Sequence, residues 1–238
     1  MRRLVADAAV LGTTFPAEAL VAVSGQDDAA VRVALAELVR REVLTVSADP
    51  LSPERGSYGF AQNMLRQVAY DTLSRRDRKT RHLKVAAHLR AAFPGDGEEV
   101  AEVIARHYLD ALGAVPDDPD VADIRHNVVG ALIQAGERAK RTGAPALAAT
   151  SYATAAELSS TGGVTAGDTP DGSPSAGVLW ERAAKAASAN ADWAAAVGHA
   201  DRARDFYQQC GDSRAAARAQ AIAGRALLYW GHHADARE

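Results

Sequence analysis

Cysteine is nearly absent from this sequence, and so is any long apolar run. The single cysteine, Cys210, cannot form a disulfide within the chain, which favours a reducing compartment and predicts a cytoplasmic protein. No stretch approaches the roughly 18 consecutive apolar residues that a membrane-spanning helix requires. Asp7 interrupts the apolar residues that follow the basic opening Met1-Arg2-Arg3. We therefore interpret the opening as a core helix and not as a signal peptide.

Sequence patterns typical of enzymes are also missing. The chain has no Gly-x-x-x-x-Gly-Lys-Ser/Thr loop to hold a triphosphate, and no strand-turn-helix elbow to expose a nucleophile. His232 and His233 are adjacent and point apart on a helix, and His82 and His88 are not four residues apart. We expect each histidine to be a surface or packing residue. The sequence thus predicts a non-enzymatic chain with no cofactor, no metal site and no catalytic residue.

The composition is that of an ordinary folded protein. The 238 residues suffice for two small domains, and 47% are hydrophobic against 24% charged. A formal net charge of −3 argues against a general polyanion binder, although a basic face can exist within a balanced total.

One stretch, residues 58–70, organises the first part of the chain. Tyr58 and Phe60 share one face of a strand, and the apolar residues from Met64 onward follow helical spacing. This stretch is typical of the second strand of a β-wing that leads into a helix.

The residues before this stretch predict three short helices, a strand and a loop. Gly12 ends the first helix, Thr13 to Pro16 restart the chain as a helix cap, and Asp27 or Asp28 caps the third helix. The expected helices are 4–11, 16–23 and 28–41, followed by a strand at 43–47 and a loop at 49–57. Helices at 64–73 and 74–93 follow. This order predicts a winged-helix domain with a small β-hairpin over residues 1–94.

The helix after Ser74 carries a basic cluster. Its possible nucleic-acid contacts are Arg75, Arg76, Arg78 and Lys79, with Arg81 and Lys84 nearby. No aromatic residue interleaves with these charges, and the expected groove-binding helix at 28–41 is not conspicuously basic. We therefore favour a solvated helix face, and nucleic acid is an unlikely partner.

Residues 95–238 predict a helical repeat array. Helices are expected at 98–111 and 121–142, a loop at 159–177, and small residues recur in matching places afterwards. Gly143, Ala191 and Gly231 form one column, seven residues after Gly136, Ala184 and Gly224. Small residues let helices approach closely while a large residue fills the neighbouring gap. These columns resemble the tetratricopeptide repeat, with the last repeat cut within its second helix. The fold class expected is therefore mainly α, a winged-helix domain followed by a tetratricopeptide-like solenoid.

The order of these elements resembles the middle of bacterial multidomain signal-transduction ATPases of the STAND type. Such proteins are often linked to class III adenylate or guanylate cyclases or to LuxR-type DNA-binding domains. The matching segments are residues 8–12 with Phe15, 35–44, Phe60 with 68–70, His82 with Val85, Ala86 and Leu89, Ala105 with His107 and Tyr108, and 135–139. The resemblance implies an upstream ATPase module as partner, and a protein or small-molecule signal on the repeats.

One residue departs from the family pattern. Gln62 stands where these proteins commonly carry a histidine that can reach the phosphates of a bound nucleotide. An amide can donate a hydrogen bond but carries no positive charge, which places nucleotide sensing here in doubt. Two other functions stay open at this point: a DNA-binding transcriptional regulator that uses the winged helix, and a free-standing repeat adaptor.

Overall fold

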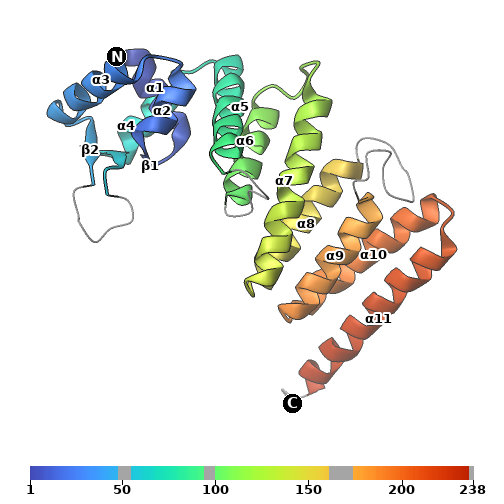
Figure 1. Cartoon of the computed structure of the whole chain (residues 1–238). Helices are drawn as coiled ribbons and strands as arrows, with labels where there is room; N and C mark the ends of the chain where they lie inside the picture. The colour runs from blue at the N-terminus through green and yellow to red at the C-terminus, as the bar shows by residue number, and fades with distance from the viewer. Residues whose placement is uncertain (48–54, 94–99, 161–173, 236–238) are drawn as a thin grey trace. The chain divides into compact units, whose positions relative to one another are not determined.

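The computed structural model describes residues 1–47, 55–93, 100–160 and 174–235. Within these ranges the chain is mainly helical, with eleven helices and one three-stranded antiparallel sheet near the N-terminus (Figure 1). Contacts divide the chain into two compact units, which we describe separately. Unit 1 comprises residues 1–94 and 106–121, and unit 2 comprises residues 95–105 and 122–238. The expected domain boundary after residue 94 stays a prediction.

Unit 1 contains the sheet and the first helices. Its elements are α1 (Arg2–Leu11), β1 (Thr14–Phe15), α2 (Ala17–Ser24), α3 (Asp28–Arg40), β2 (Leu44–Val46), β3 (Tyr58–Phe60), α4 (Asn63–Asp71) and α5 (Arg75–Ala92). Helix α6 (Ala101–Ala114) has residues in both units.

The predicted helix boundaries are confirmed where a local hydrogen bond sets them. The Asp27 carboxylate accepts from the Ala30 amide at the start of α3, and the Ser74 hydroxyl accepts from the Asp77 amide at the start of α5. Gly25 ends α2 in the left-handed conformation, with φ of 66°. These signals are local, so the sequence alone could place them.

The sheet has three strands, one more than the predicted β-hairpin. Residues Thr14 and Phe15, expected to restart the chain as a helix cap, form β1 and pair with β3, giving the order β1-β3-β2. The Phe15 ring lies 6.3 Å from the ring of Tyr58 and 6.4 Å from that of Phe60. Tyr58 and Phe60 were predicted to lie on one face of their strand, and both rings pack on this side against the buried Phe15.

The core of unit 1 lies between the first three helices and the sheet. Its fully buried members are aliphatic or aromatic: Leu4, Ala8, Phe15, Ala17, Leu20, Val31, Leu35, Leu38 and Leu44. A second cluster joins α1 and α2 to the helices after the sheet through Ala6, Val10, Val23, Leu73 and Val85.

Unit 2 is built from consecutive packed helices. They are α7 (Val121–Arg141, in unit 2 from residue 122), α8 (Pro145–Ser160), α9 (Ala176–Ala189), α10 (Trp193–Gln209) and α11 (Ser213–Asp235). Helix α9 packs against α8 and α10, and α10 packs against α11 (Figure 1). Most of the expected loop at 159–177 falls outside the described residues, but Ala176 and Gly177 already belong to α9.

The first two turns of unit 2 occur at matching residues, whereas the third does not. Gly143 after α7 and Ala191 after α9 both have positive φ, of 74° and 57°. Gly231, the third member of this column, lies inside α11, which runs to Asp235, and the turn before this helix lies at Gly211. A shared column of small residues therefore does not by itself mark where a helix ends.

Close packing at a small residue is confirmed for Gly136. A Cβ atom placed on this residue of α7 would lie 2.6 Å from the Tyr152 ring of α8. A Cβ atom placed on Gly177 of α9 would likewise lie 2.7 Å from the Tyr207 ring of α10. The absence of a Cβ atom at both positions thus leaves the space that the tyrosine ring occupies.

Within the described ranges, no helix has both the length and the apolarity that crossing a membrane requires.

Candidate binding surfaces

The four basic residues proposed as nucleic-acid contacts do not share one open face. Arg75 and Arg76 are exposed at the start of α5. Arg78 lies over the Tyr70 ring, 4.5 Å from its centroid, and forms an ion pair with Asp71. Lys79 is only 6% exposed and is held by the carboxylates of Asp118, at 2.6 Å, and Asp120.

The expectation of a solvated helix face is therefore wrong for part of this cluster. Besides Lys79, Arg81 is buried, and its Nε donates to the Asp7 carboxylate of α1 at 2.6 Å. Arg81 also donates to Asp77 at 3.0 Å, one turn earlier on its own helix. These charges are used in packing α5 within unit 1, because buried ions need partners close by.

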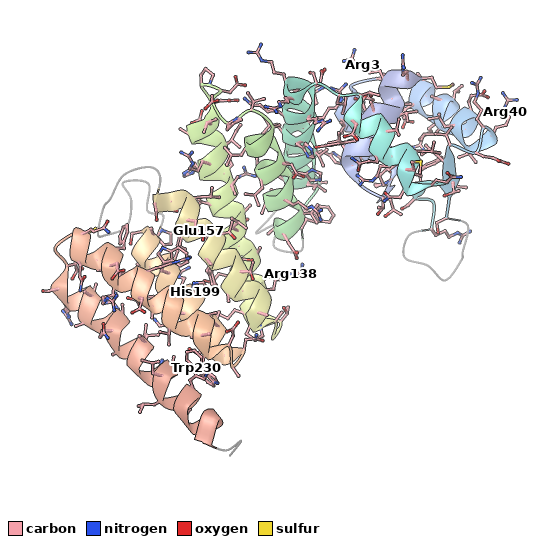
Figure 2. All side chains as sticks on the ribbon, turned by 180° about the vertical axis from the view of Figure 1, so that it is seen from behind. Arg3, Arg40, Arg138, Glu157, His199 and Trp230 are labelled. Atoms are coloured by element: carbon pink, nitrogen blue, oxygen red, sulfur yellow. The ribbon has the colours of Figure 1, made fainter. Side chains whose placement is uncertain are left out.

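Helix α3 also offers few free positive charges. Arg32 forms ion pairs with Glu18 and Asp28, at 3.1 and 2.9 Å. Arg40, labelled in Figure 2, and Arg41 both bind the Glu37 carboxylate. Since the arginines of this helix and its C-cap are already paired with carboxylates, α3 presents a nearly neutral surface.

Helix α4 has an exposed apolar stripe beside Gln62. Gln62 is the N-cap of α4, its side chain is exposed, and it makes no capping hydrogen bond. In the helix, Met64 and Val68 are 72% and 59% exposed, and Leu65 is 37% exposed. The helical spacing predicted for these residues is confirmed, but only Ala69 among the residues of α4 is buried. An amphipathic helix with an uncovered apolar side is typical of a surface that binds another protein.

Unit 2 contains a groove of about 510 Å³ between α7, α8 and α9. Its apolar lining comes from small residues and Tyr152, and its charged lining from both signs. The lining residues are Glu137, Lys140, Gly143, Pro145, Ala148, Tyr152, Arg182, Lys185, Ala186 and Ala189. A cavity of this size matches those that hold small molecules or a side chain of a partner.

Tyr152 is the central residue of this groove. Its side chain is 2% exposed, and its hydroxyl has no hydrogen-bond partner within 3.5 Å among the described residues. Burial, together with the nearby Glu137 carboxylate, raises the pKa of Tyr152, so the hydroxyl stays protonated. Arg182 lies over the ring at 5.9 Å and donates to Glu137 at 3.0 Å. The groove therefore combines a tyrosine ring, whose hydroxyl is buried beside Glu137, with an arginine whose positive charge is partly compensated by the same carboxylate.

A smaller groove of about 320 Å³ lies between α8, the α9–α10 turn and α10. Glu157 and His199, both labelled in Figure 2, contribute to its lining. The His199 ring stacks on Trp180 at 5.4 Å, and burial lowers the pKa of this histidine. Arg202 covers the Trp180 ring at 4.7 Å and binds Glu157. Since its charged and aromatic groups already contact one another, this groove is the weaker candidate.

Two histidines in unit 1 meet although sequence spacing gave no reason to pair them. His82 on α5 and His107 on α6 face each other with their Nδ1 atoms 2.9 Å apart, and both are buried. Burial lowers the pKa of each imidazole to about 4. Asp110 lies one turn after His107, and burial raises the pKa of its carboxyl. A signal was present in His107-x-x-Asp110, a spacing that puts both side chains on one face of a helix.

No protein-family model, curated protein or solved structure matches this chain.

Proposed function

We propose that this chain is a non-catalytic regulatory and scaffold segment of a bacterial multidomain signalling ATPase. In this proposal unit 1 is a winged helix that docks on a nucleotide-binding module upstream and relays its nucleotide state. Unit 2 is a tetratricopeptide-like array that binds a protein or small-molecule signal. A nucleotide cyclase or a DNA-binding domain elsewhere in the parent protein would supply the output.

The observation that carries the proposal is the exposed apolar stripe of α4. Met64, Leu65 and Val68 directly follow Gln62, the residue at the position of the family's nucleotide-sensing histidine. Covering large apolar side chains with a partner contributes about 25 cal/mol of binding free energy for each Å² of apolar surface removed from water. A module docked on α4 would cover the stripe and place the Gln62 amide at the interface, where it can donate a hydrogen bond.

The groove of unit 2 supports the second half of the proposal. The groove lining has three cations, Lys140, Lys185 and Arg182, against one carboxylate, Glu137, and this excess favours a ligand with an acidic group. Arg182 already pairs with Glu137 and Lys185 with Glu181, so Lys140 is the cation that a ligand would contact first. The Tyr152 ring gives the groove an apolar wall, and its hydroxyl is buried beside the Glu137 carboxylate. A carboxylate-bearing signal or an acidic side chain of a partner protein fits this chemistry.

The same observations weigh against DNA binding by unit 1. Phosphate contacts require accessible basic side chains, and they supply most of the affinity of such proteins. Lys79 and Arg81 are buried in ion pairs, and the arginines of α3 and its C-cap are paired with carboxylates. Salt-sensitive binding of duplex DNA, lost on neutralising the exposed Arg75 and Arg76, would reverse this conclusion.

The experiment measures ATP hydrolysis by the native full-length protein with single substitutions in unit 1. Val68→Glu places a charge in the stripe, and Val33→Glu is the matched control, because Val33 on α3 is also exposed, at 72% against 59% for Val68. We expect Val68→Glu to change turnover about fivefold or more, the lower end of ordinary coupling between sites, and Val33→Glu to leave it unchanged. Equal activity in all three proteins would overturn docking by α4. A native protein without a P-loop module upstream would overturn the ATPase setting.

A further inference from the structure

Three potential metal ligands converge in unit 1, from α5 and α6. The donor atoms of His82, His107 and Asp110 all lie within 4.8 Å of one another. The two Nδ1 atoms are 2.9 Å apart, and an Asp110 carboxylate oxygen lies 3.7 Å from the Nδ1 of His82. The group thus combines two imidazole nitrogens and one carboxylate, contributed by two different helices.

We propose that these three residues bind one divalent transition-metal ion, with Zn²⁺ as the representative case. Two nitrogens and one oxygen suit ions of this class, whereas Mg²⁺ and Ca²⁺ prefer oxygen ligands alone. Three protein ligands leave a fourth position for water, as in the open type of zinc site. The ion would tie α5 to α6 by coordinate bonds.

The distances require only a small adjustment. Two nitrogens bound to a tetrahedral ion at about 2.0–2.1 Å lie about 3.3 Å apart. The Nδ1 atoms at 2.9 Å would separate by a few tenths of an ångström, and the carboxylate at 3.7 Å would approach by a similar amount. The Asp110 side chain is 46% exposed, so that an ion can reach the site from solvent and the carboxylate can rotate toward it.

The surroundings hold the imidazoles in the form that binds metals. The Tyr70 hydroxyl lies 3.0 Å from the Nε2 of His82, which leaves Nδ1 directed at the cluster. Metal-bound histidines usually use their second nitrogen in such a hydrogen bond, which fixes the ring orientation. Burial also keeps both rings neutral near pH 7, and only the neutral ring has a lone pair to offer.

The competing explanation is a simple hydrogen bond between two packed histidines. In that case one Nδ1 carries a proton and donates it to the other, and Asp110 is an unrelated surface carboxylate. The two explanations differ in the role of Asp110, because the histidine pair alone does not need it. They also differ in whether an added ion stabilises the protein.

The experiment titrates the chelator-treated full chain with Zn²⁺ and measures stoichiometry, affinity and thermal stability. We expect one ion per chain and a rise in the unfolding temperature with Zn²⁺ concentration. Asp110→Asn should weaken binding more than tenfold, since even an outer partner of a ligand is worth about 10- to 100-fold. Tyr70→Phe, which removes such an outer partner, should weaken binding by about that 10- to 100-fold.

His88→Asn is the matched control, because this half-buried histidine lies on the same helix and outside the cluster. It should leave the affinity unchanged. Circular dichroism of Asp110→Asn without metal checks its fold, which should be intact because the side chain is half exposed. Nitrogen chemical shifts of the imidazoles identify the bound atom, which should be Nδ1 in both rings. Unchanged affinity in Asp110→Asn, or no rise in the unfolding temperature with Zn²⁺, would leave the plain histidine pair and overturn the proposal.

Discussion

The two units hold their helices together by different means. In unit 1, α5 is joined to residues far away in the sequence by buried charges, as in the pair of Arg81 with Asp7 at 2.6 Å. In unit 2, helices consecutive in sequence pack through alanine and glycine, with a tyrosine ring against Gly136 and another against Gly177. One buried carboxylate, Glu181, is shared there with Lys185 and Arg218. Unit 1 should therefore be sensitive to the loss of a charge, and unit 2 to the gain of a methyl group.

The largest effect is expected from Asp7→Ala, which removes the partner of a buried arginine. Breaking a buried pair costs about 3–5 kcal/mol, and we expect about 3 kcal/mol because Asp77 still accepts from Arg81. Alanine keeps α1 helical, so the loss reports on the ion pair. Hydrogen exchange of the α5 amides measures the change in the free energy of opening.

A control for this prediction is Asp28→Ala, which removes an exposed ion pair with Arg32 in the same unit. It should cost less than about 1 kcal/mol. The double variant Asp7→Ala/Arg81→Met should recover most of the stability, since no buried charge is left unpaired. Equal effects of Asp7→Ala and Asp28→Ala would remove the distinction between the units.

The next effect is expected in unit 2 from Gly136→Ala. The added Cβ would lie 2.6 Å from the Tyr152 ring. Overpacking costs about 1–3 kcal/mol, which exceeds the gain of about 1 kcal/mol in helix propensity. Urea unfolding followed by tryptophan fluorescence measures it, because the three tryptophans, including Trp230 in Figure 2, all lie in unit 2.

Gly130→Ala is the matched control on the same helix. Apart from its chain neighbours and the nearby backbone of α7 itself, no atom of the described residues lies within 4 Å of a Cβ at this position. The substitution should stabilise unit 2 by up to about 1 kcal/mol. Destabilisation by both substitutions would mean that the small residues of α7 are not matched to individual neighbours.

A smaller effect is expected from Lys79→Met, which sharpens the comparison within unit 1. The lysine is buried, but its partners Asp118 and Asp120 are 23% and 46% exposed and can be hydrated when it is gone. Methionine keeps the apolar contacts of the lysine stem, so the free energy of opening should fall by less than about 1 kcal/mol. Exchange of the α5 amides provides the measurement. A loss as large as that of Asp7→Ala would show that burial of one partner alone decides the effect.

The smallest effect on stability is expected from Tyr152→Phe in unit 2. The hydroxyl has no hydrogen-bond partner within 3.5 Å in the part of the chain that the structure describes, so its removal should change the free energy of unfolding by less than about 0.5 kcal/mol. Urea unfolding followed by tryptophan fluorescence checks this. A loss above about 1 kcal/mol would mean that the hydroxyl is hydrogen-bonded within the fold, with the neighbouring Glu137 carboxylate as the acceptor.

The sequence predicted what depends on local chemistry. Asp27 and Ser74 were recognisable as caps because each bonds an amide three residues away. Gly136 was recognisable because helix periodicity fixes which small residues face a neighbouring helix. Helices α3 and α5 follow from signals of this kind, whereas the length of α11, which continues through Gly231, does not.

The rest depends on partners that are distant along the chain. Strand β1 has only two residues, too few to show a period, and it exists because β3 lies beside it. Arg81 looked like a solvated residue because Asp7 is 74 positions away. The same holds for the pair of His82 and His107, which are 25 positions apart. A pattern of neighbouring residues cannot indicate partners that are 25 or 74 positions apart in the sequence.

The most direct test of docking by α4 compares hydrogen exchange of residues 63–71 in the native full-length protein and in the isolated chain of residues 1–238. In the isolated chain the stripe of Met64, Leu65 and Val68 is exposed to water. We predict that α4 exchanges more slowly in the full-length protein, and that the difference changes when ADP is replaced by a non-hydrolysable ATP analogue. Identical exchange in both proteins and with both nucleotides would contradict the proposal that α4 docks on a nucleotide-binding module.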